Sequence, residues 1–307
     1  MADDEAACTI CLDGSGTLLR KGCACRGSSS WAHAECMARA VAVQLPRRGE
    51  RAWSECQTCG QHFTGQMTVA LAALWSETHR GCAMSLRATA LQNVGAYAEA
   101  ERMFRDVLEA RTARYGRTHK ATLETMGKLA SAMQPMWHDE DKRAESETLW
   151  RAVHACRVRT LGAEDPLTLA SQASLALALS HGRLAEAERL FEATIDAQTR
   201  VLGPEHAHTL VAKSNYASML SRRGDDAAAE PIFRAVIAAH RRLMGDLHPH
   251  TMLMHGNLAQ CLANQHRHDE ARDMYGRTAV TMRDVLGPMH PDTREYARRA
   301  RLVAAPV

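Results

Sequence analysis

The stretch LGPEHAHTLVAKSNYASML (Leu202–Leu220) contains the signals that decide the fold of this chain. Gly203 can end a helix because glycine readily adopts the left-handed conformation of a helix C-terminus. Thr209, six positions later, is a residue type that favours the start of the next helix. Ala217 follows as a small side chain at which two helices can approach closely. The stretch therefore predicts one helix end, a short loop and a second helix.

The same pattern recurs along most of the chain. The glycines follow one another at nearly equal intervals, the first interval being the longest, and they are Gly116, Gly162, Gly203, Gly245 and Gly287. An aromatic residue precedes each glycine by twelve positions: Phe104, Trp150, Phe191, Phe233 and Tyr275. A small residue precedes each by sixteen: Ala100, Ser146, Ala187, Ala229 and Ala271. Side chains four positions apart share a helix face. A period of roughly 40 residues indicates a solenoid of helical hairpins, and we expect five hairpins and a closing helix.

Composition supports a helical, globular protein. The chain has 307 residues, of which 46 % are hydrophobic, 24 % charged and 5 % aromatic. Ala, Leu, Glu and Arg favour helix, whereas a mostly β protein needs more β-branched and aromatic residues. The net charge of +3 gives no general signal for nucleic acid or membrane. The sequence lacks a run of roughly 20 apolar residues and a basic leader. It therefore predicts a cytoplasmic location and leaves the nucleus open.

The cysteines are concentrated near the N-terminus. Seven of the ten lie no further along the chain than Cys59 and, with one histidine, they form four close pairs: Cys8 and Cys11, Cys23 and Cys25, His33 and Cys36, Cys56 and Cys59. Such spacing directs two side chains at one tetrahedral metal, so eight ligands predict two structural Zn²⁺ ions. A disulfide framework is the alternative, but it requires an oxidising compartment and an even number of cysteines.

The ligand order resembles that of a known zinc domain. The motifs are CTIC (Cys8–Cys11), GCACRGSSSWAHAEC (Gly22–Cys36) and WSECQTC (Trp53–Cys59). They resemble the RING-CH, or RING-variant, domain of a class of ubiquitin ligases. The PHD finger has the same order but usually fewer residues between the fourth Cys and the His. The RING-CH resemblance implies a cross-brace in which Cys8, Cys11, His33 and Cys36 hold one zinc and Cys23, Cys25, Cys56 and Cys59 hold the other.

This resemblance implies a ubiquitin ligase that acts without a covalent intermediate. The head would recruit a ubiquitin-conjugating enzyme, and the repeats would select a protein substrate. Ile10 and Trp53 would contact the conjugating enzyme, although both could instead pack the small core. Gln57 and Gly60 stand where many active RINGs have proline and a cationic residue. A non-catalytic interaction scaffold with a structural zinc domain is therefore the alternative, and the assignment as an enzyme stays open.

The repeats resemble the tetratricopeptide repeat in its kinesin-light-chain form. Leu202–Leu220 and LGPMHPDT (Leu286–Thr293) carry this resemblance. It implies a groove in which Asn215 and Asn257, at the same position of successive repeats, hydrogen-bond a bound peptide. Lys213 would favour an acidic ligand. The alternative is that both asparagines cap or bridge helices.

The sequence thus predicts a mostly α protein with three parts. Residues 1–65 form the two-zinc RING-CH domain, 66–79 a connecting helix, and 80–307 the solenoid with its C-terminal capping helix. A histidine recurs three positions after most of the repeat glycines. We expect it to be structural or capping, because a catalytic site is normally asymmetric. The sequence contains no nucleophile elbow or phosphate loop.

Overall fold

The computed structural model describes residues 10–11, 15, 17–20, 31–48, 52, 55–56, 63, 65–78, 83–93, 95–136, 138–288 and 291–303. The chain divides into two compact units, Met1–Leu149 and Trp150–Val307. The division falls within a long helix, α6 (Glu140–Leu161).

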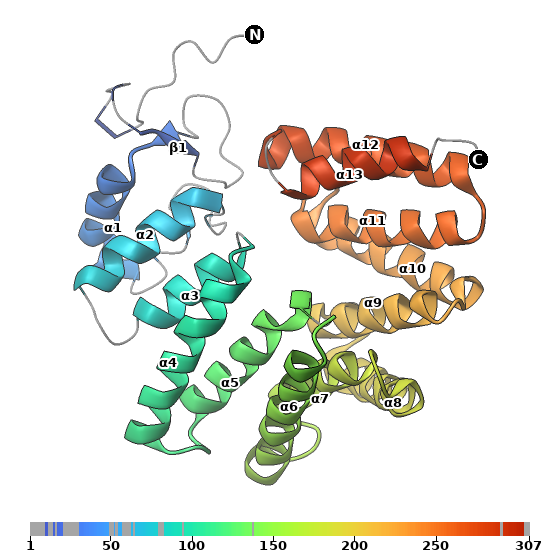
Figure 1. Cartoon of the computed structure of the whole chain (residues 1–307), viewed down its shortest axis with the longest axis horizontal. Helices are drawn as coiled ribbons and strands as arrows, with labels where there is room; N and C mark the ends of the chain where they lie inside the picture. Colours follow the sequence, from blue (N-terminus) through green and yellow to red (C-terminus); the bar gives the residue numbers. More distant parts are fainter. Residues whose placement is uncertain are drawn as a thin grey trace. The chain divides into compact units, whose positions relative to one another are not determined.

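The first unit begins with a small head that is followed by helices (Figure 1). In the head, β1 pairs antiparallel with β2, with Leu19 opposite Ala32. The elements of the unit are β1 (Leu19–Arg20), β2 (Trp31–Ala32), α1 (Ala34–Arg48), α2 (Gly65–Thr78), α3 (Ala83–Asn93), α4 (Tyr97–Tyr115), α5 (Lys120–Ala132), a 3₁₀ turn η3 (Gln134–Met136) and the first part of α6.

Helix α2 joins the head to the first hairpin. Met67 and Leu71, one helical turn apart, are fully buried in the core that the head forms around Cys36 and Val41. Val69 packs against the next core, in the α3–α4 hairpin. Because residues two apart point to different sides of a helix, α2 contributes to both cores. The connecting segment is therefore a helix that seats the head on the first repeat.

The second unit consists of successive antiparallel hairpins. Each helix packs against the next one along the chain. After the end of α6, the helices are α7 (Pro166–Leu179), α8 (Leu184–Leu202), α9 (Ala207–Arg222), α10 (Asp226–Met244), α11 (Pro249–Asn264), α12 (His268–Leu286) and α13 (Pro291–Leu302). The predicted helical solenoid, with five hairpins and a closing helix among the described residues, is confirmed.

The periodic residues form the interior of this stack. The five repeated aromatic side chains are at most 7 % exposed, and the five small residues sixteen positions before the glycines are fully buried. Five further alanines, on the first helix of each hairpin, are also fully buried: Ala88, Ala130, Ala176, Ala217 and Ala259. Burying one large apolar side chain stabilises a fold by about 1.5–3 kcal/mol. Each repeated aromatic residue therefore contributes a stabilisation of about this size to its hairpin.

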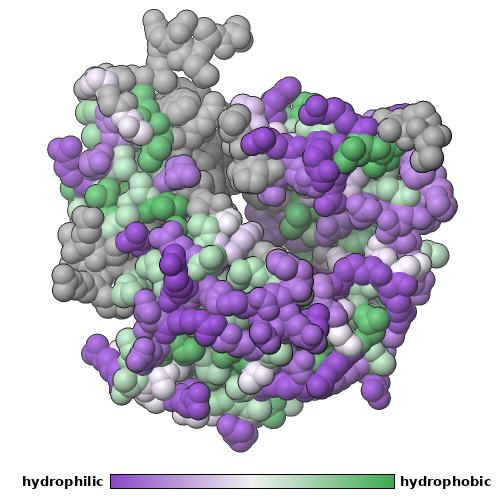
Figure 2. Space-filling view, viewed as in Figure 1, coloured by the Kyte–Doolittle hydropathy of each residue, from purple (hydrophilic) through white to green (hydrophobic). Residues whose placement is uncertain are grey.

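The closing helix carries many charged side chains. Glu295 of α13 forms ion pairs with Arg298 and Arg299. Tyr296 from the same helix is buried against Tyr275 of α12, with 5.7 Å between their ring centroids. Figure 2 shows hydrophilic side chains over α12 and α13 in this view. A polar outer surface suits the terminal helix of a solenoid.

Each junction between hairpins is built from a glycine, a capping residue and a threonine. Gly203 has a φ of +97° and ends α8. The Nδ1 atom of His206 accepts a hydrogen bond from the backbone N–H of His208 and caps the start of α9. The Thr209 hydroxyl donates to the carbonyl oxygen of Gly203, at 2.9 Å. The recurrent histidine therefore has the predicted capping role, whereas the threonine secures the loop from within the first turn.

The cap position tolerates one informative exception. The N-cap is His119, His206 and His248 before α5, α9 and α11, but it is Asp165 before α7. Burial and the neighbouring His250 lower the pKa of His248 below its ordinary value of about 6.5. The unfolded chain therefore binds this proton more readily than the folded chain. The stability that this cap contributes is complete above the ordinary pKa and declines as pH falls below it.

We therefore predict that His248→Asp will stabilise the second unit more at pH 5.5 than at pH 7.5, by about 0.5–1 kcal/mol at the lower pH. Aspartate keeps the acceptor, and its negative charge interacts favourably with the helix N-terminus. Denaturant unfolding at both pH values measures the difference. The reciprocal control, Asp165→His, should add a loss of stability at low pH. If either variant changes the free energy of unfolding equally at the two pH values, the cap at His248 is not pH-dependent.

Candidate functional site

The first helices of two adjacent hairpins in the second unit, α9 and α11, share an exposed stripe. On α9 and α11, Asn215 and Asn257 are partly exposed and occupy the same repeat position. One turn earlier, Val211 and Leu253 are each 43 % exposed. Since α9 packs against α11, the four side chains form an apolar row beside an amide row. We call these four residues the amide stripe.

The two amides of the amide stripe are available for a ligand. Neither side chain has a hydrogen-bond partner within the described part of the chain. By contrast, Asn264, further along α11, donates to Ser221 Oγ at 3.3 Å and to Asp226 Oδ1 at 3.2 Å. Asn264 therefore makes the bonds that a capping or bridging asparagine needs, whereas Asn215 and Asn257 do not. Sequence reasoning missed Val211 and Leu253, although they lie one repeat apart and each precedes an asparagine by four positions.

Lys213 does not lie on this stripe. It is two positions from Asn215, and therefore about 200° away around the helix. Its Nζ lies 3.4 Å from the carbonyl oxygen of Pro204, in the preceding loop. The structure therefore does not bring the predicted cation to the amides. Residues that are close together in a helical sequence point to different faces of the helix.

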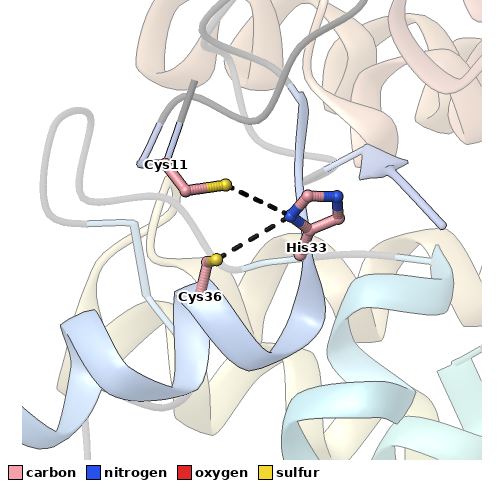
Figure 3. Close-up of side chains that lie close together, drawn as sticks. All are labelled: Cys11, His33 and Cys36. Atoms are coloured by element: carbon pink, nitrogen blue, oxygen red, sulfur yellow. Dashed lines mark hydrogen bonds between the residues drawn. The ribbon is translucent and has the colours of Figure 1, made fainter. Parts of the chain in front are cut away.

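In the head, three predicted ligands converge (Figure 3). The Nδ1 atom of His33 lies 3.4 Å from the Sγ of Cys11 and 3.8 Å from the Sγ of Cys36. Bond lengths of about 2.3 Å for Zn–S and 2.0 Å for Zn–N in a tetrahedron separate the two ligand atoms by about 3.5 Å. The ligand atoms of all three residues lie within 4.8 Å of one another. They can therefore occupy three corners of a tetrahedral metal site.

The other ring nitrogen of His33 has its own partner. Nε2 lies 2.6 Å from the backbone carbonyl oxygen of Ser15, to which it can only donate. This bond fixes the tautomer that leaves the Nδ1 lone pair directed at the two sulfur atoms. Metal-binding histidines commonly have such an outer hydrogen bond. The start of α1 also brings two of the ligands together, because His33 directly precedes this helix and Cys36 lies in its first turn.

The remaining predicted head residues divide into two groups. Cys56 is buried in the same core as Cys36. Ile10, next to Cys11, is 43 % exposed. The other ligands and the second predicted contact residue lie outside the described residues: Cys8, Cys23, Cys25, Cys59 and Trp53.

Comparison with known proteins identifies the repeats. Residues 177–242 and 208–284 match one tetratricopeptide-repeat family model, and residues 83–120 match another. No curated protein matches the sequence. None of the helices in the described part of the chain has the length and apolar character of a membrane span.

Several solved structures share the fold. Nearly identical tetratricopeptide-like repeats from Podosopora anserina, assigned to a kinesin light chain, are 23 % identical, with 67 % of this chain and 96 % of that chain covered and a TM-score of 0.50. BtubC (BKLC) from P. vanneervenii is 17 % identical, with coverages of 73 % and 90 % and a TM-score of 0.50. Bacillus thuringiensis PlcR, solved with the peptide PapR7 and DNA, is 12 % identical, with coverages of 88 % and 99 % and a TM-score of 0.54. The chain therefore carries tetratricopeptide repeats in a kinesin-light-chain-like fold.

The geometry of the amide stripe leads to a prediction about stability. The double variant Asn215→Ala with Asn257→Ala should change the free energy of unfolding by less than about 0.5 kcal/mol, because neither amide loses a partner. Asn264→Ala is the matched control on α11. This variant should lower the free energy of unfolding by about 1 kcal/mol or more. It removes one hydrogen bond to the largely buried Asp226 and one to Ser221. Denaturant unfolding compares them, and a larger loss in the double variant would show that its amides are structural.

Proposed function

We propose that this tetratricopeptide-repeat protein is a scaffold for protein interactions, and that it binds an extended peptide on the amide stripe. The observation that carries the proposal is the pair of amides without partners at one position of two adjacent repeats. An asparagine side chain offers a donor and an acceptor, which match the N–H and C=O groups of an extended backbone. A cytoplasmic location is part of the proposal.

The apolar row adds a second type of contact. Val211 and Leu253 provide exposed apolar surface one turn from the amides. Side chains of a bound peptide can cover this surface while its backbone pairs with Asn215 and Asn257. The acidic preference that Lys213 suggested has no basis on this stripe, because the lysine lies on another side of α9. The proposal therefore concerns backbone and apolar recognition and not the charge of the ligand.

The test compares partner binding by matched variants. Wild-type protein and the Asn215→Ala, Asn257→Ala variant are immobilised side by side, and captured proteins are quantified by mass spectrometry. Calorimetry then measures the affinity of a synthetic segment of the main partner. We expect the double variant to bind about tenfold more weakly, since two backbone-directed hydrogen bonds are lost.

Lys213→Ala is the control on the same helix, and it should leave that affinity unchanged. Equal affinities of the wild type and the double variant would contradict the proposal. An equal loss in the lysine variant would show that binding does not depend on the side of α9 that carries Asn215.

A second candidate function concerns the head. We propose that Cys11, His33 and Cys36, with Cys8, hold one Zn²⁺, that the remaining four cysteine ligands hold another, and that the head acts as a RING-CH ubiquitin ligase. The convergence of three ligands, together with the outer bond to Ser15, supports this proposal. Zinc would supply folding energy, because so short a segment has little core of its own.

In this proposal the protein contributes position and not covalent chemistry. The exposed side chain of Ile10 lies beside the ligand Cys11 and provides apolar contact for a ubiquitin-conjugating enzyme. Trp53 is the proposed second contact. Holding the charged enzyme and an acceptor lysine together raises their effective concentration. The repeats would then hold the substrate.

Two variants separate this candidate from a purely structural head. Ile10→Ala should retain about two zinc equivalents by elemental analysis and lose ubiquitin transfer with a panel of conjugating enzymes, because Ile10 is not a ligand. Cys36→Ser should lose both zinc and transfer. A wild-type protein that binds zinc but is inactive with every enzyme of the panel would leave the head as a structural or protein-binding module. Loss of zinc in Ile10→Ala would show that this residue belongs to the core.

A further inference from the structure

A cleft in the second unit is lined by residues of α10, α11 and α12 and of the loop between α10 and α11. It has a volume of about 460 Å³, which is within the range of sites for small molecules. His255 of α11 belongs to the lining. Asn257 lies two positions further along α11, and therefore about 200° around the helix. The cleft is thus on another side of α11 from the amide stripe.

The lining of this cleft has an excess of positive charge. Arg234 and Arg241 of α10 and Arg277 of α12 line it, and Asp246 is the one acid among the described lining residues. Counted from the repeat glycines, the corresponding residues of the preceding repeat are Glu192, Thr199, Ala235 and Pro204. The charge is therefore a property of this cleft and not of the repeat.

His255 lies among these charges without a hydrogen-bond partner. Its ring is partly buried, and no hydrogen bond to it occurs within the described part of the chain. Burial lowers the pKa of His255 below its ordinary value, and Arg241 and Arg277 lower it further, although Asp246 acts in the opposite direction. A neutral imidazole has one N–H donor and gains a second when it is protonated. His255 can therefore donate to an anion in the cleft.

Two of the three arginines are held by exposed acids. Arg241 pairs with Asp246 at 2.6 Å. Arg277 pairs with Asp273 at 2.7 Å. All four side chains are more than half exposed, and such surface pairs contribute little to stability. Both guanidinium groups can therefore turn to a phosphate, with which arginine forms strong bidentate hydrogen bonds.

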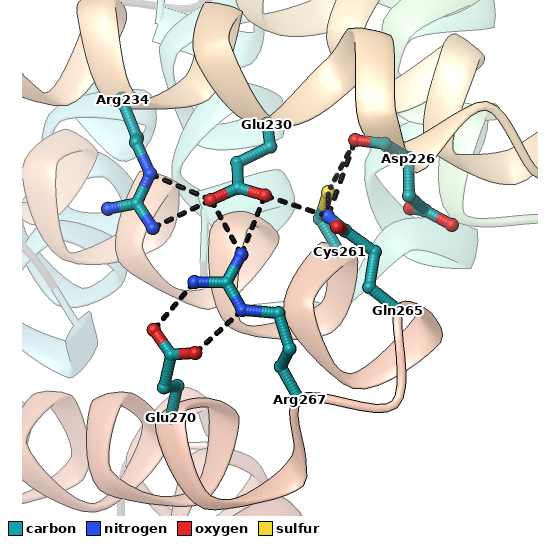
Figure 4. Close-up of polar contacts among 7 residues, drawn as sticks. All are labelled: Asp226, Glu230, Arg234, Cys261, Gln265, Arg267 and Glu270. Carbon is teal, nitrogen blue, oxygen red and sulfur yellow. Dashed lines mark hydrogen bonds and ion pairs between the residues drawn. The ribbon is translucent and has the colours of Figure 1, made fainter.

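The third arginine, Arg234, has a partner that does not depend on it. Arg234 pairs with Glu230 at 2.7 Å. Figure 4 shows that Glu230 is also held by Arg267 and by Gln265, both at 2.9 Å. Glu230 therefore stays paired when the Arg234 guanidinium turns to a ligand.

We propose that this cleft binds a ligand through its phosphate groups. The phosphate contacts are the guanidinium groups of Arg241 and Arg277 and the imidazole of His255. Arg234 lies two turns before Arg241 on the same side of α10 and adds a donor further along the cleft. Three arginines against one aspartate leave an excess of two positive charges, which favours a ligand with at least two negative charges. The site is independent of the amide stripe and of the proposed function.

The first test titrates the full chain with inorganic pyrophosphate at constant ionic strength. Calorimetry should give a Kd below about 1 mM, and the ring signals of His255 should shift in NMR spectra. Binding should also raise the pKa of His255, because the anion offsets the charges of the two arginines. Malonate, a dicarboxylate, should bind at least about tenfold more weakly. An equal affinity for malonate would overturn the assignment to phosphate.

Two double variants with the same loss of charge provide the decisive comparison. Arg241→Thr with Arg277→Ala copies the preceding repeat and should weaken pyrophosphate at least about tenfold, while the thermal unfolding midpoint stays within a few degrees. Arg272→Ala with Arg283→Ala removes two charges from α12 at positions outside the lining, and should leave the affinity unchanged. Equal losses in the two variants would show a response to net charge alone and would overturn the site.

Phosphate groups occur both on soluble molecules and on lipid headgroups, so the last arm decides the source. Sedimentation with phosphatidylcholine vesicles that contain phosphatidylinositol bisphosphate is measured for the wild type and for both double variants. Sedimentation that only Arg241→Thr with Arg277→Ala abolishes would assign the phosphate to a headgroup. Pyrophosphate binding without sedimentation would assign it to a soluble molecule. Absence of binding to both probes would overturn the proposal.

Discussion

The junction between hairpins is the constraint on which the rest of this structure depends. A glycine with positive φ ends one helix, a histidine or aspartate caps the next, and a threonine hydroxyl returns to the glycine carbonyl at most of the junctions. Together these groups satisfy backbone atoms that helix ends leave without intrahelical partners. Because the loop has a fixed length and geometry, each hairpin meets the next at the same positions. The alanines and aromatic residues then fall into register and bury one another.

This regularity gives the protein positions at which variation has local consequences. Residues outside the buried pattern can change from repeat to repeat without disturbing the stack, because each repeat contacts only its neighbours. Asn215 and Asn257 use that freedom on one side of the first helices. Lys213 uses it on another side of α9, where it reaches the preceding loop. The separation of the two sides follows from the periodicity of the helix.

The head is connected to the repeats through a shared helix, α2. Its described core is small and extends onto α2 through Met67 and Leu71, so the head and the first hairpin share a structural element. Cys11, His33 and Cys36 converge in the same segment. A metal at this position would link the turn at Ile10 to the start of α1. In the proposed ligase function, the head would supply position and not a nucleophile.

The sequence by itself determined the helical repeat, its period and the residues of its interior, because local signals and packing agree in every repeat. It also predicted the ligand pairs, since Cys or His side chains in one short turn need no distant information. Only the tertiary structure decided which side chains share a surface. It separated Lys213 from Asn215, although they are close neighbours in the chain, and it brought Ser15 to His33. Such features require distances between segments that are far apart in the chain, and no single stretch of sequence contains them.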